Sequence, residues 1–330
     1  MASGPRGSRF RRTLLAVLVT ASVAVPVSGA ARPAAVPAPA PPVLAPLTAV
    51  ALGPALDARY AANRVAIRAA ARMASGHGDQ RRAAALHGMA GTSRHFLSFD
   101  GRDGGRIAEV FGDLARARRI AVLVPGSDTN LDRYGRFRAG ARALQKELGA
   151  GSAVIAWLGY GTPGTVSPEA VTPGRAHEAA PRLRSFIREL RTAKPAARTA
   201  LLCHSYGSVV CALAAPGLPV SDIVLYGSPG TGVDSAAELR TRATVWAGRG
   251  DGDWIAHVPH ARLRLPFTTL GFGPDPVSRE FGARLFDAGP AGHSDYLKSG
   301  SLSLRNLARI VAGAGNTGVS VQAPEAARHA

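Results

Sequence analysis

The chain has 330 residues, of which 46% are hydrophobic and 19% charged, which is enough for one sizeable domain with tails. Its formal net charge is +18, and the arginines that carry most of it are scattered along the chain. The chain has no RNA-binding or zinc-finger signature and no basic patch interleaved with aromatic residues, so we expect no nucleic-acid partner. We also expect no metal or cofactor. A basic surface leaves peripheral attraction to an anionic cell envelope open.

Residues 1–30 have the pattern of an export signal. Four arginines precede the apolar run 13–27, and the small residues of Ser28–Ala30 offer a cleavage site. The apolar run is short for a membrane span, although an uncleaved anchor is the alternative. The pair Arg11-Arg12 also permits a twin-arginine signal, so the export route stays open. We therefore expect a protein that is secreted or held in the cell envelope.

Low-complexity segments flank the predicted domain at residues 48–315. Residues 31–47, with the sequence ARPAAVPAPAPPVLAPL, form a Pro/Ala-rich linker whose composition favours an extended backbone. Residues 316–330 have the composition of a flexible tail. Neither segment is expected to contribute a core.

Helical and strand patterns alternate within the predicted domain. An alanine-rich amphipathic helix is expected at 54–75, and a hairpin is expected from the strands in HFLSFD and GRIAEVFGD. Helical patterns at 132–148 and 175–193 separate several of the short apolar runs that follow, at 119–124, 153–158, 199–203, 222–227 and 243–248. Apolar strands joined by helices are typical of a mostly parallel sheet covered on both faces. The predicted fold class is therefore α/β, with an N-terminal helical segment before the sheet.

The run TALLCHSYGSVV places a serine where an apolar strand meets a helix. Gly207 stands two residues after Ser205, and Cys203 stands two residues before it, where the G-x-S-x-G elbow has glycine. Small residues at these positions relieve crowding in a sharp turn that exposes the hydroxyl at the edge of the sheet. Ser205 is therefore the candidate nucleophile, with an ordinary turn serine as the alternative.

An acid and a base are expected in loops that follow later strands. Asp251 and Asp253, in GRGDGDWI, both come after the run 243–248 and both fit the acid. His293, in PAGHSDY, is the candidate base. The other histidines that follow the acids lie too near them or in the tail: His257, His260 and His329. Serine, acid and histidine then stand in the chain order of the α/β-hydrolase triad.

An oxyanion hole requires two backbone N–H groups. The N–H of Tyr206, at the start of the elbow helix, is one candidate. The second is expected in PGSDTN after the run 119–124, where Ser127 is the first choice and Gly126 and Asp128 are the alternatives. The alternative is that this loop is an ordinary Pro-Gly turn with no role in the site.

Six separated motifs between Arg94 and Ala312 resemble an actinobacterial α/β-hydrolase family long catalogued as a domain of unknown function: VPGSDTNLDRY, AWLGYGTP, LLCHSYGSVV, DWIAHVPH, DPVSREFGARLF and GHSDY. The resemblance implies the α/β-hydrolase fold, with Ser205 as nucleophile and His293 as base. It favours Asp253 over Asp251, because the family's acid precedes an aromatic residue or proline and then isoleucine. It implies no particular substrate.

These features predict an exported serine hydrolase that cleaves a small-molecule or lipid carboxylic ester. An acyltransferase on the same scaffold and a non-catalytic envelope-binding protein are the alternatives. The Gly/Pro-rich stretch 159–180 is expected to form part of a cap over the site. Aromatic residues are candidates for an acyl pocket, or for ordinary core and rim: Trp157, Tyr160, Tyr206 and Trp254. Cys203 and Cys211 are expected either to form a disulfide beside the nucleophile or to remain buried thiols.

Overall fold

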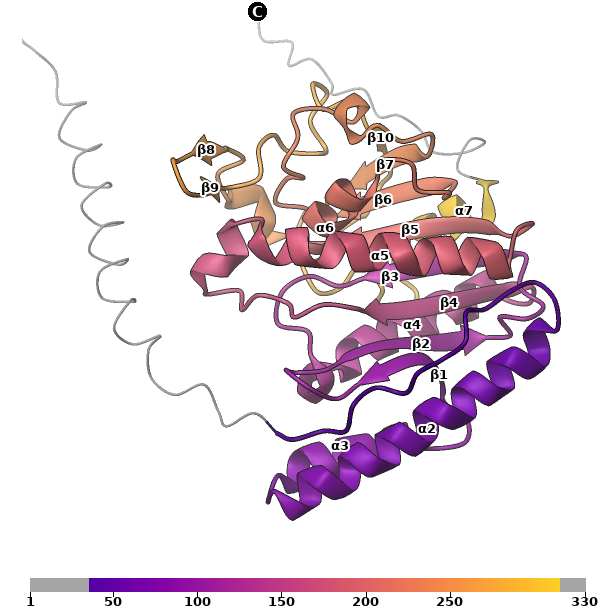
Figure 1. Cartoon of the computed structure of the whole chain (residues 1–330). Helices are drawn as coiled ribbons and strands as arrows, with labels where there is room; N and C mark the ends of the chain where they lie inside the picture. The colour runs from indigo at the N-terminus through magenta and orange to yellow at the C-terminus, as the bar shows by residue number, and fades with distance from the viewer. Residues whose placement is uncertain (1–35, 315–330) are drawn as a thin grey trace, which may run out of the picture. The chain divides into compact units, whose positions relative to one another are not determined.

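The computed structural model describes residues 36–314 (Figure 1). The predicted export signal, the first residues of the predicted linker and the predicted tail lie outside the described residues. Among residues 36–314, no helix combines the length and hydropathy needed to cross a membrane.

An eight-stranded sheet in the order β1-β2-β4-β3-β5-β6-β7-β10 forms the centre of the fold. The strands are β1 (His95–Asp100), β2 (Arg106–Gly112), β3 (Arg119–Val124), β4 (Ser152–Leu158), β5 (Arg198–His204), β6 (Asp222–Tyr226), β7 (Thr244–Gly248) and β10 (Arg284–Leu285). β1 and β2 form the predicted antiparallel hairpin, and β2 pairs antiparallel with β4. All other pairs in this sheet are parallel. The predicted α/β-hydrolase fold, with a mostly parallel sheet, is confirmed.

Helices cover both faces of this sheet. They are α2 (Leu52–Gly76), α3 (Gln80–Met89), α4 (Gly135–Leu148), α5 (Gly174–Ala193), α6 (Gly207–Ala214) and α7 (Leu302–Ala312). α5 and α6 pack together on one face, while α4 and α7 pack together on the other (Figure 1). α2 packs on β1 and α3, which confirms the predicted N-terminal helical segment.

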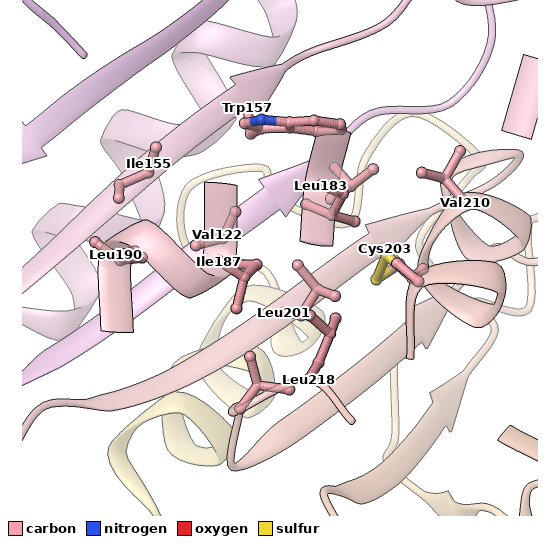
Figure 2. Packing of buried hydrophobic residues seen from close by; sticks show 14 of the residues in the cluster. Val122, Ile155, Trp157, Leu183, Ile187, Leu190, Leu201, Cys203, Val210 and Leu218 are labelled. Atoms are coloured by element: carbon pink, nitrogen blue, oxygen red, sulfur yellow. A yellow bond between two sulfur atoms is a disulfide. The ribbon is translucent and has the colours of Figure 1, made fainter. Parts of the chain in front are cut away.

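The central strands are buried on both faces, which explains their continuous apolar runs. Every residue of β4 is buried, and so is every residue of β3 after Arg119. Figure 2 shows part of this core, in which apolar side chains of α5 pack over strand residues that include Val122, Ile155 and Leu201. This packing holds the carboxyl ends of the parallel strands at one edge of the sheet.

The C-terminal end of the predicted linker contacts the domain. Leu47 is buried, and its backbone N–H donates to Glu189 of α5 at 3.0 Å. Arg59 of α2 donates to the same carboxylate oxygen at 2.8 Å and also to the carbonyl oxygen of Ala45. These contacts join the segment around Leu47 to both α2 and α5.

Candidate active site

Ser205 lies at the sharp corner between β5 and α6. Its backbone φ is 52°, in the left-handed region, which a residue with a Cβ atom occupies at a cost of about 1 kcal/mol. The N–H of Ser205 donates to the carbonyl oxygen of Tyr226 at 3.0 Å, so pairing with β6 extends to the corner itself. The side chain of Ser205 therefore leaves the strand at its carboxyl edge, as the sequence predicted.

Two glycines allow the loop after β3 to approach this corner. A Cβ atom on Gly207 would lie 2.7 Å from the carbonyl oxygens of both Val124 and Pro125. A Cβ atom on Gly126 would lie 2.6 Å from the Cβ atom of Ser205. Both positions therefore require glycine for steric reasons, and the loop after β3 lies directly against the candidate nucleophile.

Cys203 and Cys211 form a disulfide with their Cα atoms 6.4 Å apart. It joins the penultimate residue of β5 to the middle of α6, and both cysteines are fully buried. The hydroxyl of Ser208 donates to the carbonyl oxygen of Cys203 at 3.2 Å across the same corner. Of the two outcomes left open by the sequence, the structure has the bridge.

Ser205, His293 and Asp253 lie in one chain of hydrogen bonds. His293 Nε2 is 3.0 Å from Ser205 Oγ, and His293 Nδ1 is 2.8 Å from Asp253 Oδ1. Asp253 is 2% exposed, whereas Asp251 is exposed and its side chain makes no hydrogen bond or ion pair within residues 36–314. Of the two candidate acids, only Asp253 reaches the candidate base.

The Asp253 carboxylate is kept charged by hydrogen-bond donors. Burial raises its pKa, but hydrogen bonds from His293, Tyr296 and the N–H of Ile255 outweigh burial and hold the pKa below its usual value. The Tyr296 hydroxyl is 2.5 Å from Asp253 Oδ2 and accepts from the N–H of Gly250 at 3.0 Å. Because the Gly250 N–H already occupies a lone pair of this hydroxyl, the hydroxyl hydrogen of Tyr296 points at the carboxylate.

Tyr296 is a residue of the site for which the sequence predicted no role. It stands three residues after His293 in GHSDY, so the motif contained the signal. Its phenol is almost fully buried, and burial together with the Asp253 carboxylate raises its pKa far above the usual value. The hydroxyl is therefore protonated near pH 7 and donates to Asp253.

A second histidine, His204, lies beside the candidate base. Its Nε2 atom is 2.7 Å from the backbone carbonyl oxygen of His293, and the two rings are 4.8 Å apart. Because a carbonyl oxygen only accepts, Nε2 of His204 carries the hydrogen. Burial, together with the neighbouring His293, lowers the pKa of His204 to about 3. His204 is therefore neutral near pH 7 and adds no positive charge next to His293.

The backbone N–H groups of Tyr206 and Ser127 donate no hydrogen bond to any residue in the described part of the chain. The N–H of Asp128 is used by the carbonyl oxygen of Pro163 at 3.0 Å, which removes this alternative for the oxyanion hole. Gly126 and Ser127 remain, both in the loop that lies against Ser205.

Three of the four candidate pocket aromatics belong to the framework around the site. Trp157 and Tyr160 are buried, and the Tyr160 hydroxyl donates to the carbonyl oxygen of Pro125 at 2.7 Å. The Tyr206 hydroxyl donates to the carbonyl oxygen of Thr172 at 2.8 Å, and burial raises its pKa to about 12. Only Trp254 is exposed, at 48%, with its ring 4.6 Å from that of His293.

The predicted cap is shorter than expected. Residues 159–173 form a loop with one 3₁₀ turn, Pro168–Val171, and this loop bonds to Asp128 and Tyr206 as described above. From Gly174 the chain enters α5, whose buried alanines Ala176, Ala179 and Ala180 belong to the layer that covers the sheet. Because residues 174–180 belong to α5 and not to the loop, the predicted cap boundary at residue 180 is wrong.

No cluster of three or more His, Cys, Asp or Glu side chains within residues 36–314 is arranged to hold a metal ion.

The strand order, the strand-turn-helix corner and the loop positions of the candidate acid and base together define an α/β-hydrolase fold.

Comparison with known proteins agrees with this class. The family model described as alpha/beta hydrolase matches residues 100–263, a range that contains Ser205 and Asp253 and ends before His293. An uncharacterized protein of Mycobacterium tuberculosis is 30% identical over 257 residues, which is 67% of this chain and 38% of that protein. A second one is 35% identical over 143 residues, or 39% of this chain and 53% of that protein. The chain therefore spans less than two thirds of the length of these relatives.

Two solved structures are also similar to this chain. An α/β serine hydrolase without a lid from Xanthomonas campestris has a TM-score of 0.44 and 19% identity, covering 68% of this chain and 95% of that one. The esterase LipW from Mycobacterium marinum has a TM-score of 0.41 and 16% identity, covering 82% of this chain and 98% of that one.

Proposed function

We propose that the protein is a serine hydrolase that cleaves carboxylic esters through an acyl-enzyme. The observation that carries the proposal is the continuous hydrogen-bond chain from Ser205 Oγ through both ring nitrogens of His293 to the buried Asp253 carboxylate. A serine hydroxyl is a weak nucleophile unless a base removes its proton, and His293 Nε2 lies within reach of that proton.

In the first half-reaction, Ser205 Oγ attacks the ester carbonyl and its proton passes to His293 Nε2. The imidazolium that forms is stabilised by Asp253, which also holds Nδ1 protonated beforehand. The ester C–O bond then breaks, and the alcohol leaves with the proton from Nε2. The products of this step are the free alcohol and an acyl group on Ser205.

The negative oxygen that develops during the attack requires donors that are not already engaged. The N–H groups of Tyr206 and of Ser127 or Gly126 meet this requirement, because none of them donates to a residue within 36–314. Gly126 in particular has no side chain between the loop and Ser205. In the second half-reaction, His293 takes a proton from water, the hydroxide attacks the acyl carbonyl, and Ser205 is released with its proton restored.

Labelling with a fluorophosphonate tests the nucleophile without knowledge of the substrate. We expect the label on Ser205 in the wild type and none in Ser205→Ala. With a soluble p-nitrophenyl ester as substrate, Ser205→Ala and His293→Ala should each lower kcat by about 10⁴-fold, and the double variant by hardly more. Ser294→Ala is the matched control, since this exposed serine lies next to His293 and its hydroxyl bonds, among residues 36–314, only to Arg136. A folded protein whose Ser205 stays unlabelled contradicts the proposal.

We further propose that the protein is exported. The arginine-rich, apolar and small-residue order of residues 1–30 supports this, and so does a disulfide in the core, because disulfides persist in oxidising compartments. N-terminal sequencing of the protein from the culture fluid or cell envelope should give a start near Ala31. A cytosolic pool that retains Met1 is the contrary result.

A further inference from the structure

We propose that the apolar hairpin, defined as Leu263–Leu270, inserts into an anionic lipid surface and holds the mouth of the active site against it. The hairpin consists of β8 (Leu263–Arg264), β9 (Thr269–Leu270) and the turn between them. It is a separate two-stranded sheet, and Figure 1 shows it at the margin of the domain, away from the central strands.

The hairpin exposes large apolar side chains that a protein in water normally covers. Phe267 at its tip is 100% exposed, and the three leucines of the hairpin are 37–58% exposed: Leu263, Leu265 and Leu270. The N–H of Leu265 donates to the carbonyl oxygen of Thr268 at 2.8 Å, which closes the turn around Pro266 and Phe267. A closed turn with proline presents Phe267 at little further cost in conformational entropy. Contiguous exposed apolar residues of this kind mark an interaction surface.

Contacts on both sides place the hairpin at the rim of the candidate site. On its N-terminal side, Trp254 lies against the ring of His293. On its C-terminal side, the ring of Phe272 packs edge-on against Tyr206 at 5.6 Å, next to Ser205. The N–H of Gly271 also donates to the carbonyl oxygen of Val171 in the loop over the site, at 2.8 Å. These contacts tie the chain on both sides of the hairpin to residues beside His293 and Ser205, so a surface that covers the hairpin lies near the candidate site.

The charges around the hairpin favour an anionic lipid surface as its binding partner. Arg264 is exposed and makes no ion pair with any residue in the described part of the chain, while Arg262 is held by Asp234. No acidic residue occurs between Ala261 and Pro274, and the whole chain is strongly basic. Arginine beside exposed leucine and phenylalanine suits the boundary between headgroups and acyl chains.

The same charge argues against a second copy of the chain on this surface. A two-fold dimer through the hairpin would bring Arg264 of each copy towards the other's hairpin, where no carboxylate is available to pair with it. Lipid headgroups supply the missing negative charge. Docking requires only the surface, so it does not depend on the proposed hydrolysis.

Co-sedimentation with vesicles tests this inference. We expect the wild type to bind vesicles that contain phosphatidylglycerol in phosphatidylcholine, and to bind phosphatidylcholine alone much more weakly. Phe267→Ser should weaken binding by about 30-fold, because one large apolar side chain no longer enters the acyl region. Arg264→Gln should weaken binding to the anionic vesicles by about 5-fold and reduce its salt dependence.

Two controls keep folding and catalysis apart from docking. Val65→Ser removes a side chain of α2 that is 64% exposed and should bind vesicles like the wild type. Ser205→Ala should also bind like the wild type, and Phe267→Ser should label with fluorophosphonate as the wild type does. Wild-type protein that stays in the supernatant overturns the inference. So does a concentration-dependent dimer that Phe267→Ser dissociates while vesicle binding is unchanged.

Discussion

The nucleophile corner and the acid-base loops are built in different ways. The corner is formed by residues adjacent in the chain, with a strand, a helix and a disulfide that closes them over eight positions from Cys203 to Cys211. Asp253 and His293 lie in irregular loops, and 40 positions of the chain separate them. Those loops are joined by an isolated β-bridge between Gly252 and Gly292. Side-chain hydrogen bonds add to it, such as those from Tyr296 to Asp253 and from His204 to the backbone of His293.

The nucleophile and the base are therefore positioned by different kinds of contact. At the corner, the position of Ser205 follows from β5, its apolar packing and the glycines around it. In the loops, the position of the base follows from polar contacts between segments that are far apart in the chain and lie outside the named strands. Changes to the framework of the corner, other than Ser205 itself, should therefore appear mainly as lost stability, and changes to the acid-base loops mainly as lost rate.

Apart from changes to Ser205 and His293 themselves, the largest effect should come from the acid. Asp253→Asn leaves the shape of the loop but removes the charge that orients His293, so kcat for a soluble ester should fall by about 10³- to 10⁴-fold. Asp251→Asn is the matched control and should change kcat by less than about 2-fold, because its side chain contacts no group of the site. Steady-state kinetics of both variants measures this. A greater loss in the Asp251 variant would exchange the two assignments.

Removing the disulfide should lower the stability of the protein while leaving the geometry at Ser205 in place. Replacing both Cys203 and Cys211 by alanine releases the closed loop in the unfolded chain and should lower the free energy of unfolding by about 2.5 kcal/mol. Denaturant unfolding measures the loss. We expect kcat of the folded variant to stay within about 3-fold, since the bond from Ser205 N–H to Tyr226 and the glycine contacts remain. Alkylation of both thiols in native, unreduced wild-type protein would show that no bridge forms.

Removing the hydrogen bond from Tyr296 to Asp253 should change kcat and the pH dependence of kcat/KM. Tyr296→Phe deletes the hydroxyl that donates to Asp253 and should lower kcat by about 10-fold. Without this donor the pKa of Asp253 rises, and the more basic carboxylate stabilises the imidazolium of His293. The acidic limb of the kcat/KM profile should therefore move to higher pH. A purely structural role would lower the melting temperature and leave this limb in place.

The smallest effect concerns His204 and acid stability. Its pKa in the folded protein, about 3, lies below the ordinary value of 6.5, so the unfolded chain binds this proton first as pH falls. Stability is thus fully present above pH 6.5 and is lost progressively below it, by about 1 kcal/mol between pH 7 and pH 5 for a partly accessible ring. His204→Gln keeps a donor near the His293 carbonyl and cannot be protonated. Its unfolding free energy should depend less steeply on pH than that of the wild type, and equal slopes would remove His204 as the cause.

The amino-acid sequence by itself determined the layered fold and the nucleophile corner. Strands such as β3 and β4 are buried on both faces, so their apolar runs are visible without any knowledge of their neighbours. Gly207 stands two residues after Ser205, so the elbow pattern is visible within one short segment. Both features can be recognised from residues close together in the chain, although the backbone that Gly207 contacts, at Val124 and Pro125, lies in another loop.

Tertiary structure alone decided the remaining features of the site. Residue spacing allowed both Asp251 and Asp253, and only the family resemblance favoured Asp253. In the structure, Asp253 is the one that bonds to His293 across the sheet edge. The Tyr296 hydroxyl and the His204 ring, which lies at the end of β5, become part of the site through folding, because side-chain hydrogen bonds to distant loops follow no sequence period. The same holds for the disulfide, whose Cα separation depends on how α6 folds back along β5. Local patterns specify elements, whereas polar contacts between distant loops exist only once those elements have packed.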